Sequence, residues 1–258
     1  MSDHHGQFVW CELMTTDADA ATDFYTRVVG WTAADSGMPD KRYTILSAGD
    51  TRIGGVMELP RSVLERGARP GWVGYIAARD VDAAAARVRD AGGAIHHGPE
   101  DIPGIGRFAV VQDPQGAVFT LFRAADGGAA PPPAAAMPGH VGWHELRAAD
   151  SEAAFAFYAD LFGWTRAEAF DMGPMGTYQL FAPAGGRAIG GMMTRPDPAD
   201  RPSWGHVFNV EGIDAASSRV AEAGGRVTDG PHEVPGGAWV VRCTDPQDVT
   251  FALVAPVR

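Results

Sequence analysis

Cysteine is nearly absent from this sequence, which contains only Cys11 and Cys243. Two cysteines cannot supply the disulfide framework of a small secreted domain, so we expect a reducing, cytoplasmic setting. Cys11 lies between Trp10 and Glu12 in an expected strand, and alternation places its thiol on the opposite face from theirs. We therefore expect Cys11 to be a buried structural thiol rather than a nucleophile.

Long apolar runs and clusters of basic residues are also missing. No stretch approaches the roughly 20 apolar residues that a membrane-spanning helix requires, and the N-terminal residues lack the pattern of a secretory signal. The formal net charge is −11, and Lys and Arg form no run. Because binding to a phosphate backbone requires clustered positive charge, the sequence predicts a protein that binds neither membranes nor nucleic acids.

What the sequence does contain is an internal duplication. The run Trp-x-Glu-Leu occurs twice, and Glu12 and Glu145 are 133 residues apart (145 − 12). Gly30 and Gly163 are separated by the same 133 residues (163 − 30). A repeat of this regularity predicts two related domains.

The composition changes between the two copies. Residues 124–139 are rich in Ala, Gly and Pro, which is typical of an extended linker that cannot pack a core. The sequence therefore predicts a flexible tail at residues 1–6, a first domain at 7–124, a linker at 125–139 and a second domain at 140–258.

Each half contains two units of the order strand, helix, strand, strand, strand. In the first unit, a half-buried strand over residues 8–14 precedes a helix that Asp17 caps and Gly30 ends. The second unit has a helix over residues 81–91, and a tight turn at residues 113–116 joins its last two strands. The same pieces recur after the linker, so we expect four such units.

These pieces together resemble the vicinal oxygen chelate superfamily, which contains glyoxalase I, bleomycin and fosfomycin resistance proteins, and extradiol dioxygenases. The matching signatures are Asp17-x-Asp-x-x-x-Asp-Phe24-Tyr25-x-x-x-x-Gly30, Asp80-Val81-Asp82 leading to Ala91-Gly92-Gly93, and Asp113-Pro114-x-Gly116. The resemblance implies an α+β fold of two tandem domains. Each domain would consist of two βαβββ units whose curved mixed sheets surround a cavity.

The resemblance also implies where a metal ion would be held. Carried over by register, the ligand positions are Trp10, Glu58, Val73 and Thr120 in the first domain, and Trp143, Thr194, Gly205 and Ala252 in the second. Of these residues only Glu58 can bind a metal, whereas a catalytic divalent ion needs about three protein ligands. We therefore expect neither a metal site nor another cofactor.

Two histidines leave a metal-binding alternative open. His144 and His206 each lie beside an implied ligand position, and a shift of one residue would turn both inward. The same shift would move every other side chain of those strands to the opposite face, including Trp143 into the core. The alternative interpretation is two histidines that are hydrogen-bonded under the helices or at the rim of the sheet.

Strand alternation places Trp10 and Glu12 on the wall of the first cavity, and Trp143 and Glu145 on the wall of the second. Glu12 and Glu145 are candidates for general acid or base catalysis; binding a ligand by hydrogen bonds and a purely structural role are the alternatives. The candidate ligand-binding residues are Trp10, Tyr75, Thr120, Phe122, Trp143, Val207 and Asn209, together with Tyr43 and Tyr178, whose facing is open.

An aromatic, apolar wall with few polar groups is typical of a small-molecule pocket. Our leading hypothesis is a metal-independent tandem protein that binds a small apolar or aromatic molecule in one or both cavities, as drug-sequestering family members do. The alternative is an enzyme: a glyoxalase-like lyase, an isomerase, or an oxygenase or hydroxylase. It would use Glu12 or Glu145 as acid or base, or a metal held through Glu58 and a histidine that a shifted register turns inward. A filled core and an assembly scaffold are further alternatives. The duplication predicts a monomer or a weak homodimer.

Overall fold

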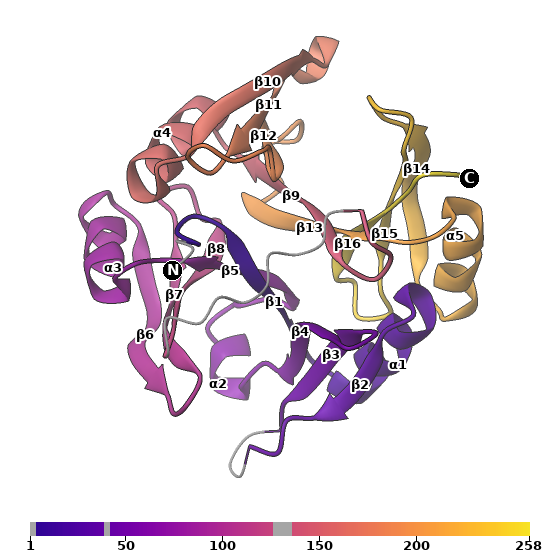
Figure 1. Cartoon of the computed structure of the whole chain (residues 1–258), viewed down its shortest axis with the longest axis horizontal. Helices are drawn as coiled ribbons and strands as arrows, with labels where there is room; N and C mark the ends of the chain where they lie inside the picture. Colours follow the sequence, from indigo (N-terminus) through magenta and orange to yellow (C-terminus); the bar gives the residue numbers. More distant parts are fainter. Residues whose placement is uncertain (1–3, 39–41, 126–135) are drawn as a thin grey trace. The chain divides into compact units, whose positions relative to one another are not determined.

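The computed structural model describes residues 4–38, 42–125 and 136–258. Its first half contains two βαβββ modules (Figure 1). The first module consists of β1 (Phe8–Thr15), α1 (Ala18–Val29), β2 (Thr32–Asp35), β3 (Thr44–Ala48) and β4 (Thr51–Glu58). After the short helix α2 (Arg61–Leu64), the second consists of β5 (Gly71–Ala77), α3 (Val81–Asp90), β6 (Ala94–Ile102), β7 (Gly106–Gln112) and β8 (Val118–Ala124).

The second half repeats this order. The third module consists of β9 (Val141–Ala148), α4 (Ser151–Phe162), β10 (Thr165–Asp171), the 3₁₀ helix η1 (Gly173–Met175), β11 (Thr177–Ala182) and β12 (Gly190–Thr194). The fourth consists of β13 (Ser203–Asn209), α5 (Ile213–Glu222), β14 (Arg226–Glu233), β15 (Trp239–Thr244) and β16 (Thr250–Ala255). The predicted fourfold repetition of the module is confirmed.

The strands form two eight-stranded mixed sheets with the same topology. The strand order is β2-β3-β4-β1-β5-β8-β7-β6 in one sheet and β10-β11-β12-β9-β13-β16-β15-β14 in the other. In every module the first strand runs parallel to the last, as β1 does to β4 and β9 to β12. The other neighbouring strands within each module are antiparallel. This confirms the predicted α+β fold of two tandem domains, each built from two βαβββ modules.

The helix ends follow the local chemistry of the sequence. The side chains of Asp17 and Asp150 accept hydrogen bonds from backbone N–H groups in the first turns of α1 and α4. Gly30 and Gly163 end these helices in the left-handed conformation, at φ of 87° and 71°, which a residue with a side chain adopts only with strain. Both helices therefore begin and end where the sequence predicts.

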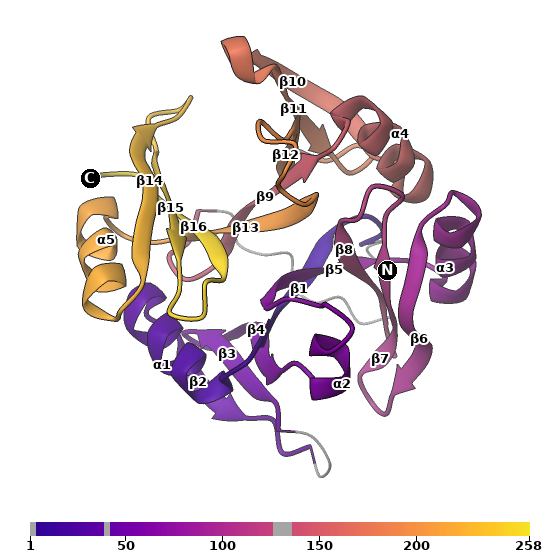
Figure 2. The same ribbon diagram turned by 180° about the vertical axis from the view of Figure 1, so that it is seen from behind.

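Two compact units divide the chain, and each draws on both sequence repeats. One consists of Met1–Trp10, Val73–Pro132 and Trp143–Trp204. Its apolar core combines Ile76 and Phe119 with Leu146 and Tyr158, and helix α3 lies beside α4 (Figures 1 and 2). Each of the two apolar cores combines side chains from both repeats. Some of these side chains are more than half the chain length apart in the sequence.

The other unit consists of Cys11–Trp72, Pro133–Gly142 and Gly205–Arg258. Its core combines Leu13 and Tyr25 with Phe208 and Leu253, and helix α1 lies beside α5. The compact units therefore do not coincide with the domains at residues 7–124 and 140–258, which remain a prediction from the repeat. Of the predicted linker, residues 126–135 lie outside the described part of the chain.

The segment predicted as a tail enters the fold at Gly6. This buried residue donates its N–H to the Ala77 carbonyl at 2.9 Å, and its own carbonyl accepts from the Trp164 indole at 2.7 Å. Residues 1–3 lie outside the described residues. The symmetry-related contact joins the Trp31 indole to the Gly139 carbonyl at 2.6 Å.

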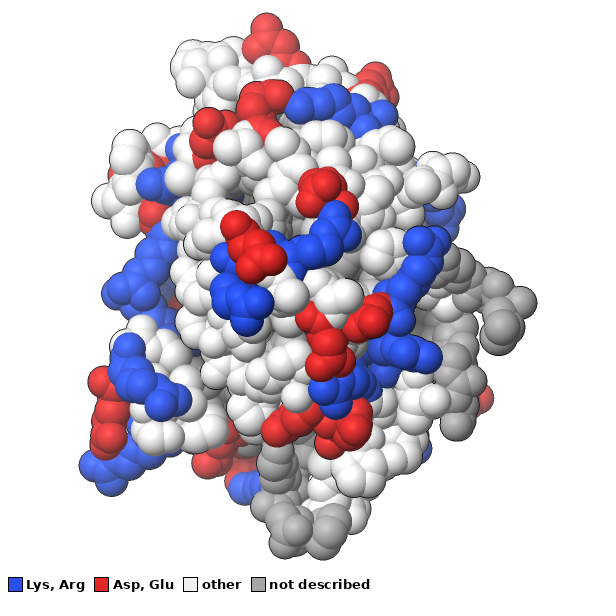
Figure 3. Space-filling model, turned by 90° about the vertical axis from the view of Figure 1, so that its left-hand side faces the viewer, with Lys and Arg blue, Asp and Glu red and all other residues white. Residues whose placement is uncertain are grey.

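Charged side chains of both signs are interspersed on the face drawn in Figure 3. Arg107, for example, forms ion pairs with Asp82 at 2.6 Å and with Asp101 at 3.1 Å. This face carries no continuous basic patch of the kind that binds a phosphate backbone. No helix among the described residues is long and apolar enough to cross a membrane.

Candidate functional site

The register of β9 against β12 defines the two faces of the third module. Leu146 lies opposite Met192, and both are buried in the core. Glu145 lies opposite Gly191, one residue out of phase, so its side chain projects from the other face. Arg147 shares that face because it follows Glu145 by two residues.

Four side chains on this face form a hydrogen-bonded group, which we call the Glu145 cluster: Trp143, Glu145, Arg147 and Tyr178. The Trp143 indole donates to the Tyr178 hydroxyl at 2.8 Å, and this hydroxyl donates to Oε2 of Glu145 at 3.4 Å. Nε of Arg147 donates to Oε1 of Glu145 at 3.2 Å. The Glu145 side chain is only 14% exposed and that of Arg147 is 33% exposed, so the carboxylate is largely buried and the guanidinium is the more accessible of the two.

Glycine at position 191 is what allows Tyr178 to lie across the sheet. A Cβ atom at Gly191 would overlap the phenol ring of Tyr178. The ring therefore rests directly on the backbone of β12, where its hydroxyl reaches both Trp143 and Glu145. The facing of Tyr178, which alternation leaves open, is decided by this contact.

The first repeat places the corresponding tryptophan, glutamate and tyrosine on and beside β1 and β4. Glu12 lies opposite Gly55 and is 7% exposed, and a Cβ atom at Gly55 would overlap the phenol of Tyr43. Trp10 and Glu12 alternate with the core residues Cys11 and Leu13, as predicted.

One position distinguishes the Glu145 cluster from its counterpart in the first repeat. Two residues after Glu12 stands Met14, opposite Met57 on β4. The corresponding residue after Glu145 is Arg147, opposite Met193 on β12. The first repeat therefore carries a thioether where the second carries a guanidinium.

The second module presents a separate aromatic face. Tyr75 lies opposite Thr120, and the rings of Tyr75 and Phe122 meet edge to face with centroids 6.0 Å apart. The alternate residues, among them Ile76 and Leu121, point into the core. Tyr75, Thr120 and Phe122 thus share one face, in agreement with their predicted parity.

In the fourth module, Val207 lies opposite Ala252 and Asn209 opposite Val254. The Asn209 amide packs against Gly142, where a Cβ atom would overlap its side-chain oxygen. Nδ2 of Asn209 is buried and has no hydrogen-bond partner among the described residues. Val207 and Asn209 therefore share a face, but Asn209 is held against the backbone of β9.

The two histidines of the alternative metal hypothesis lie on the core side of their strands. His144 is 5% exposed and stacks on Phe8 with ring centroids 3.7 Å apart. His206 is 1% exposed, and burial lowers its pKa to about 4. Neither ring shares the face of the Glu145 cluster.

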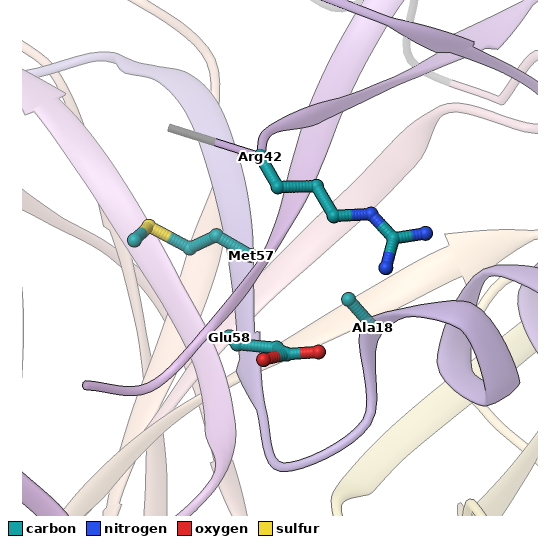
Figure 4. A pocket seen from close by; sticks show the side chains of 4 residues that line it. All are labelled: Ala18, Arg42, Met57 and Glu58. Carbon is teal, nitrogen blue, oxygen red and sulfur yellow. The ribbon is translucent and has the colours of Figure 1, made fainter. Parts of the chain in front are cut away.

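Glu58, the remaining implied metal ligand, lines a half-open pocket of about 240 Å³ with Ala18, Arg42 and Met57. Figure 4 shows the side chains of Arg42 and Glu58 extending to the side of Ala18, with Met57 pointing away. Arg42 is ion-paired with Asp19, which raises the pKa of Arg42, and Glu58 adds to this effect. A metal ion at Glu58 would compete with this guanidinium.

The described residues therefore do not fit a resident metal ion. Among them, no group of three or more His, Cys, Asp or Glu side chains is arranged to hold one. Cys11 is also no nucleophile in this fold, because it is 1% exposed and burial raises the pKa of its thiol.

Arg147 is the residue of the site that the sequence analysis missed. The signal was available, because a side chain two positions after Glu145 lies on the same strand face. Strand alternation does not predict the contact between Arg147 and Glu145, because that contact depends on the rotamer of a long side chain.

A family model for the Glyoxalase/Bleomycin resistance protein/Dioxygenase superfamily matches this chain twice, over residues 7–121 and 138–253. The anthracycline biosynthesis protein DauV of Streptomyces sp. (strain C5) is 32% identical over 266 residues, which cover 96% of this chain and 93% of that protein. The putative glyoxylase CFP32 of Mycobacterium tuberculosis (strain CDC 1551 / Oshkosh) is 42% identical over 121 residues, which cover 46% of this chain and 45% of CFP32.

Solved structures share the fold at low sequence identity. The Mn(II)-bound glyoxalase from Novosphingobium aromaticivorans has a TM-score of 0.66 at 15% identity, covering 99% of this chain and 83% of its own. The 2,3-dioxygenase LapB from Pseudomonas sp. KL28 has a TM-score of 0.65 at 12% identity, covering 98% and 93%. With both repeats matched and the module order shared, the chain belongs to the Glyoxalase/Bleomycin resistance protein/Dioxygenase superfamily.

Proposed function

We propose that this protein binds a planar aromatic small molecule, without a metal ion, at the Glu145 cluster and at the corresponding face of the first repeat. The observation that carries the proposal is the chain of hydrogen bonds from Trp143 through Tyr178 to Glu145. It fixes two large aromatic rings beside a carboxylate on a strand face that the core does not cover.

Such a group suits an aromatic ligand with polar substituents. Tryptophan and tyrosine offer flat apolar surfaces at a small cost in conformational entropy, and their polar atoms bind at the edge. A few fixed polar atoms in an otherwise apolar surface are the usual composition of a small-molecule site. Tyr75 and Phe122 on the second module provide a further aromatic surface of the same kind.

The relatives support this class of ligand. DauV, and DnrV of Streptomyces peucetius at 32% identity over 264 residues, are both named anthracycline biosynthesis proteins. Anthracyclines are planar polycyclic aromatics with phenolic and quinone oxygens. Stacking on Trp143 and hydrogen bonding to Glu145 or Tyr178 would match both parts of such a molecule.

The second candidate function is catalysis by Glu145, or by Glu12 in the first repeat, as a general acid or base. It is favoured by the fixed position of the Glu145 carboxylate, which accepts from Arg147 and Tyr178. General acid–base groups require such positioning against the substrate. If this function holds, Glu145→Gln would abolish turnover of a bound substrate while leaving its affinity within about threefold.

Calorimetric titration with anthraquinone-2-carboxamide, a neutral planar probe, tests the binding proposal. We expect saturable binding by the wild-type protein. In Trp143→Ala the affinity of the second repeat should fall about tenfold, or by about 1.4 kcal/mol, while binding at the first repeat persists. Trp239→Ala is the matched control, because Trp239 packs partly against the core of its unit. Absence of saturable binding to this and related tricyclic probes would overturn the proposal.

A further inference from the structure

The two repeats present different chemistry at one position of an otherwise shared site. Arg147 follows Glu145 by two residues, and Met14 follows Glu12 in the same way. We propose that Arg147 makes the second repeat selective for aromatic ligands that carry an ionised oxygen group, such as a carboxylate or phenolate. This inference rests on the proposed function and adds the class of ligand that each repeat prefers.

The guanidinium of Arg147 has N–H donors beyond the one that binds Glu145. Its Nε is bound to Oε1 of Glu145 at 3.2 Å. Among the described residues, its two terminal nitrogens form no hydrogen bond, and its side chain is one-third exposed. An arginine presents five N–H groups in a planar fork, so the outer edge of this one can donate two parallel hydrogen bonds to a ligand's carboxylate.

Glu145 does not cancel this attraction. A ligand carboxylate on the outer edge of the fork would lie about 3 Å from the guanidinium and roughly 6 Å from the Glu145 carboxylate. Because the Coulomb energy falls as the inverse of distance, attraction exceeds repulsion about twofold. Glu145 also holds the fork in one orientation, which reduces the entropy that a ligand must remove.

The neighbouring side chains place an aromatic body beside this polar end. The Tyr178 hydroxyl is shared between Trp143 and Glu145, so both rings lie within one hydrogen-bonded group with Arg147. A ligand ring on Trp143 or Tyr178 would therefore have its acidic substituent within reach of Arg147.

The first repeat lacks this feature. Met14 and Met57 lie opposite each other on the face that carries Glu12. A thioether carries no charge and accepts hydrogen bonds only weakly, but it adapts to apolar shapes. We therefore assign the neutral, apolar preference to the first repeat and the acidic preference to the second.

The test compares two probes of the same shape, anthraquinone-2-carboxylate and anthraquinone-2-carboxamide, by calorimetry at pH 7 and low salt. The wild-type protein is expected to bind the carboxylate about tenfold more tightly, because charge-assisted hydrogen bonds exceed neutral ones. In Arg147→Met, which installs the residue of the first repeat, this preference should fall to about onefold. Arg187→Met removes the same charge from an exposed position of the second repeat and should keep the preference.

Two further variants sharpen the test. Arg147→Lys keeps the charge but loses the fork, and should retain only part of the preference. Met14→Arg in the Arg147→Met background should restore a carboxylate preference through the first repeat. Circular dichroism confirms that each variant is folded, and the wild-type preference should decline as salt is raised.

Each outcome bears on the inference. A wild-type protein that binds both probes equally, or a preference that persists in Arg147→Met, would overturn the role of Arg147 while leaving the proposed function in place. Failure of both probes to bind would overturn both.

Discussion

The hydroxyl of Tyr158 donates a hydrogen bond to Oδ2 of Asp113 at 3.0 Å, although the two residues belong to different sequence repeats. The Trp204 indole donates to the same hydroxyl at 2.9 Å. Three backbone N–H groups of the following turn bind the other carboxylate oxygen of Asp113. Tyr158, from helix α4 of the second repeat, is thereby bonded to Asp113, from the turn between β7 and β8 of the first repeat.

The symmetry-related contact has the same composition. Tyr25 donates to Asp245 at 3.2 Å and accepts from the Trp72 indole at 3.0 Å. Both tyrosines are fully buried, and burial together with the adjacent carboxylate raises the pKa of each well above its ordinary value. Each compact unit therefore contains one tyrosine–aspartate–tryptophan contact that connects the two repeats.

Tyr158→Phe tests the energetic weight of this contact. Removing the hydroxyl leaves Oδ2 of Asp113 and the Trp204 indole without their partner in a buried place, so the free energy of unfolding should fall by about 2–3 kcal/mol. Urea denaturation measures the change. Tyr178→Phe is the control, because its hydroxyl is only part-buried, and it should cost no more than about 1 kcal/mol. A loss below about 0.5 kcal/mol at Tyr158 would contradict the interpretation.

The two halves of the chain are expected to depend on each other for folding. Both apolar cores combine side chains from the two repeats, so a half-chain that ends between residues 126 and 135 lacks the other part of each core. Each half alone should be unfolded or should dimerise, whereas the two halves expressed together should form a complex of native ellipticity. Light scattering after size-exclusion chromatography measures the state. A folded, monomeric half-chain would show that a repeat is self-sufficient.

Gly191→Ala should displace Tyr178 from the sheet. The added methyl group would overlap the phenol ring, which must swing away and release both Trp143 and Glu145. We expect the affinity for anthraquinone-2-carboxylate, the probe assigned to the second repeat, to fall at least about tenfold, with a loss of stability of about 1–3 kcal/mol from overpacking. Gly186→Ala, in the loop before β12, is the control and should leave affinity within about twofold. Unchanged binding in Gly191→Ala would separate Tyr178 from the site.

His206 should make stability depend on pH. Burial lowers its pKa from 6.5 to about 4 in the folded state, so the unfolded chain binds a proton that the folded chain excludes. The stabilising contribution is therefore complete above pH 6.5 and is lost as pH falls towards 4. The wild-type protein should lose about 2 kcal/mol between pH 7 and pH 5 from this group.

Comparison with His206→Gln isolates this effect. The variant has no titrating group at this position. Between pH 7 and pH 5 it should therefore lose about 2 kcal/mol less of its free energy of unfolding than the wild-type protein. The pKa of Asp245 is raised, chiefly by burial, but this carboxyl titrates in both proteins and cancels in the difference. Equal pH profiles in urea denaturation would mean that the folded state accepts the proton at His206.

The sequence predicted the parts of the fold that local chemistry controls. Asp17 and Gly30 marked both ends of a helix, because caps and left-handed glycines act within a few residues. The alternation of Trp10, Cys11 and Glu12 identified the faces of a strand for the same reason. The module order required a strand after the first helix, but its residues were not located, because all four residues of β2 (Thr32–Asp35) are exposed and no alternation distinguishes a core face.

The site could be predicted only in part. Alternation placed Trp143 and Glu145 on one face, and the register of β9 with β12 agrees with it. The position of Tyr178 and the contact between Arg147 and Glu145 could not be derived, because they depend on where rings and long side chains go in three dimensions.

The sequence by itself was enough to identify the duplication, the βαβββ modules and the resemblance to the family. These features depend on local periodicity, capping residues and the spacing of motifs, all of which can be seen in the sequence. Only the tertiary structure decided which modules share a core. It joined Tyr158 to Asp113 and Tyr25 to Asp245 across the repeats. The physical reason is that packing and buried hydrogen bonds select partners by their position in space, which a repeat of nearly identical modules leaves open.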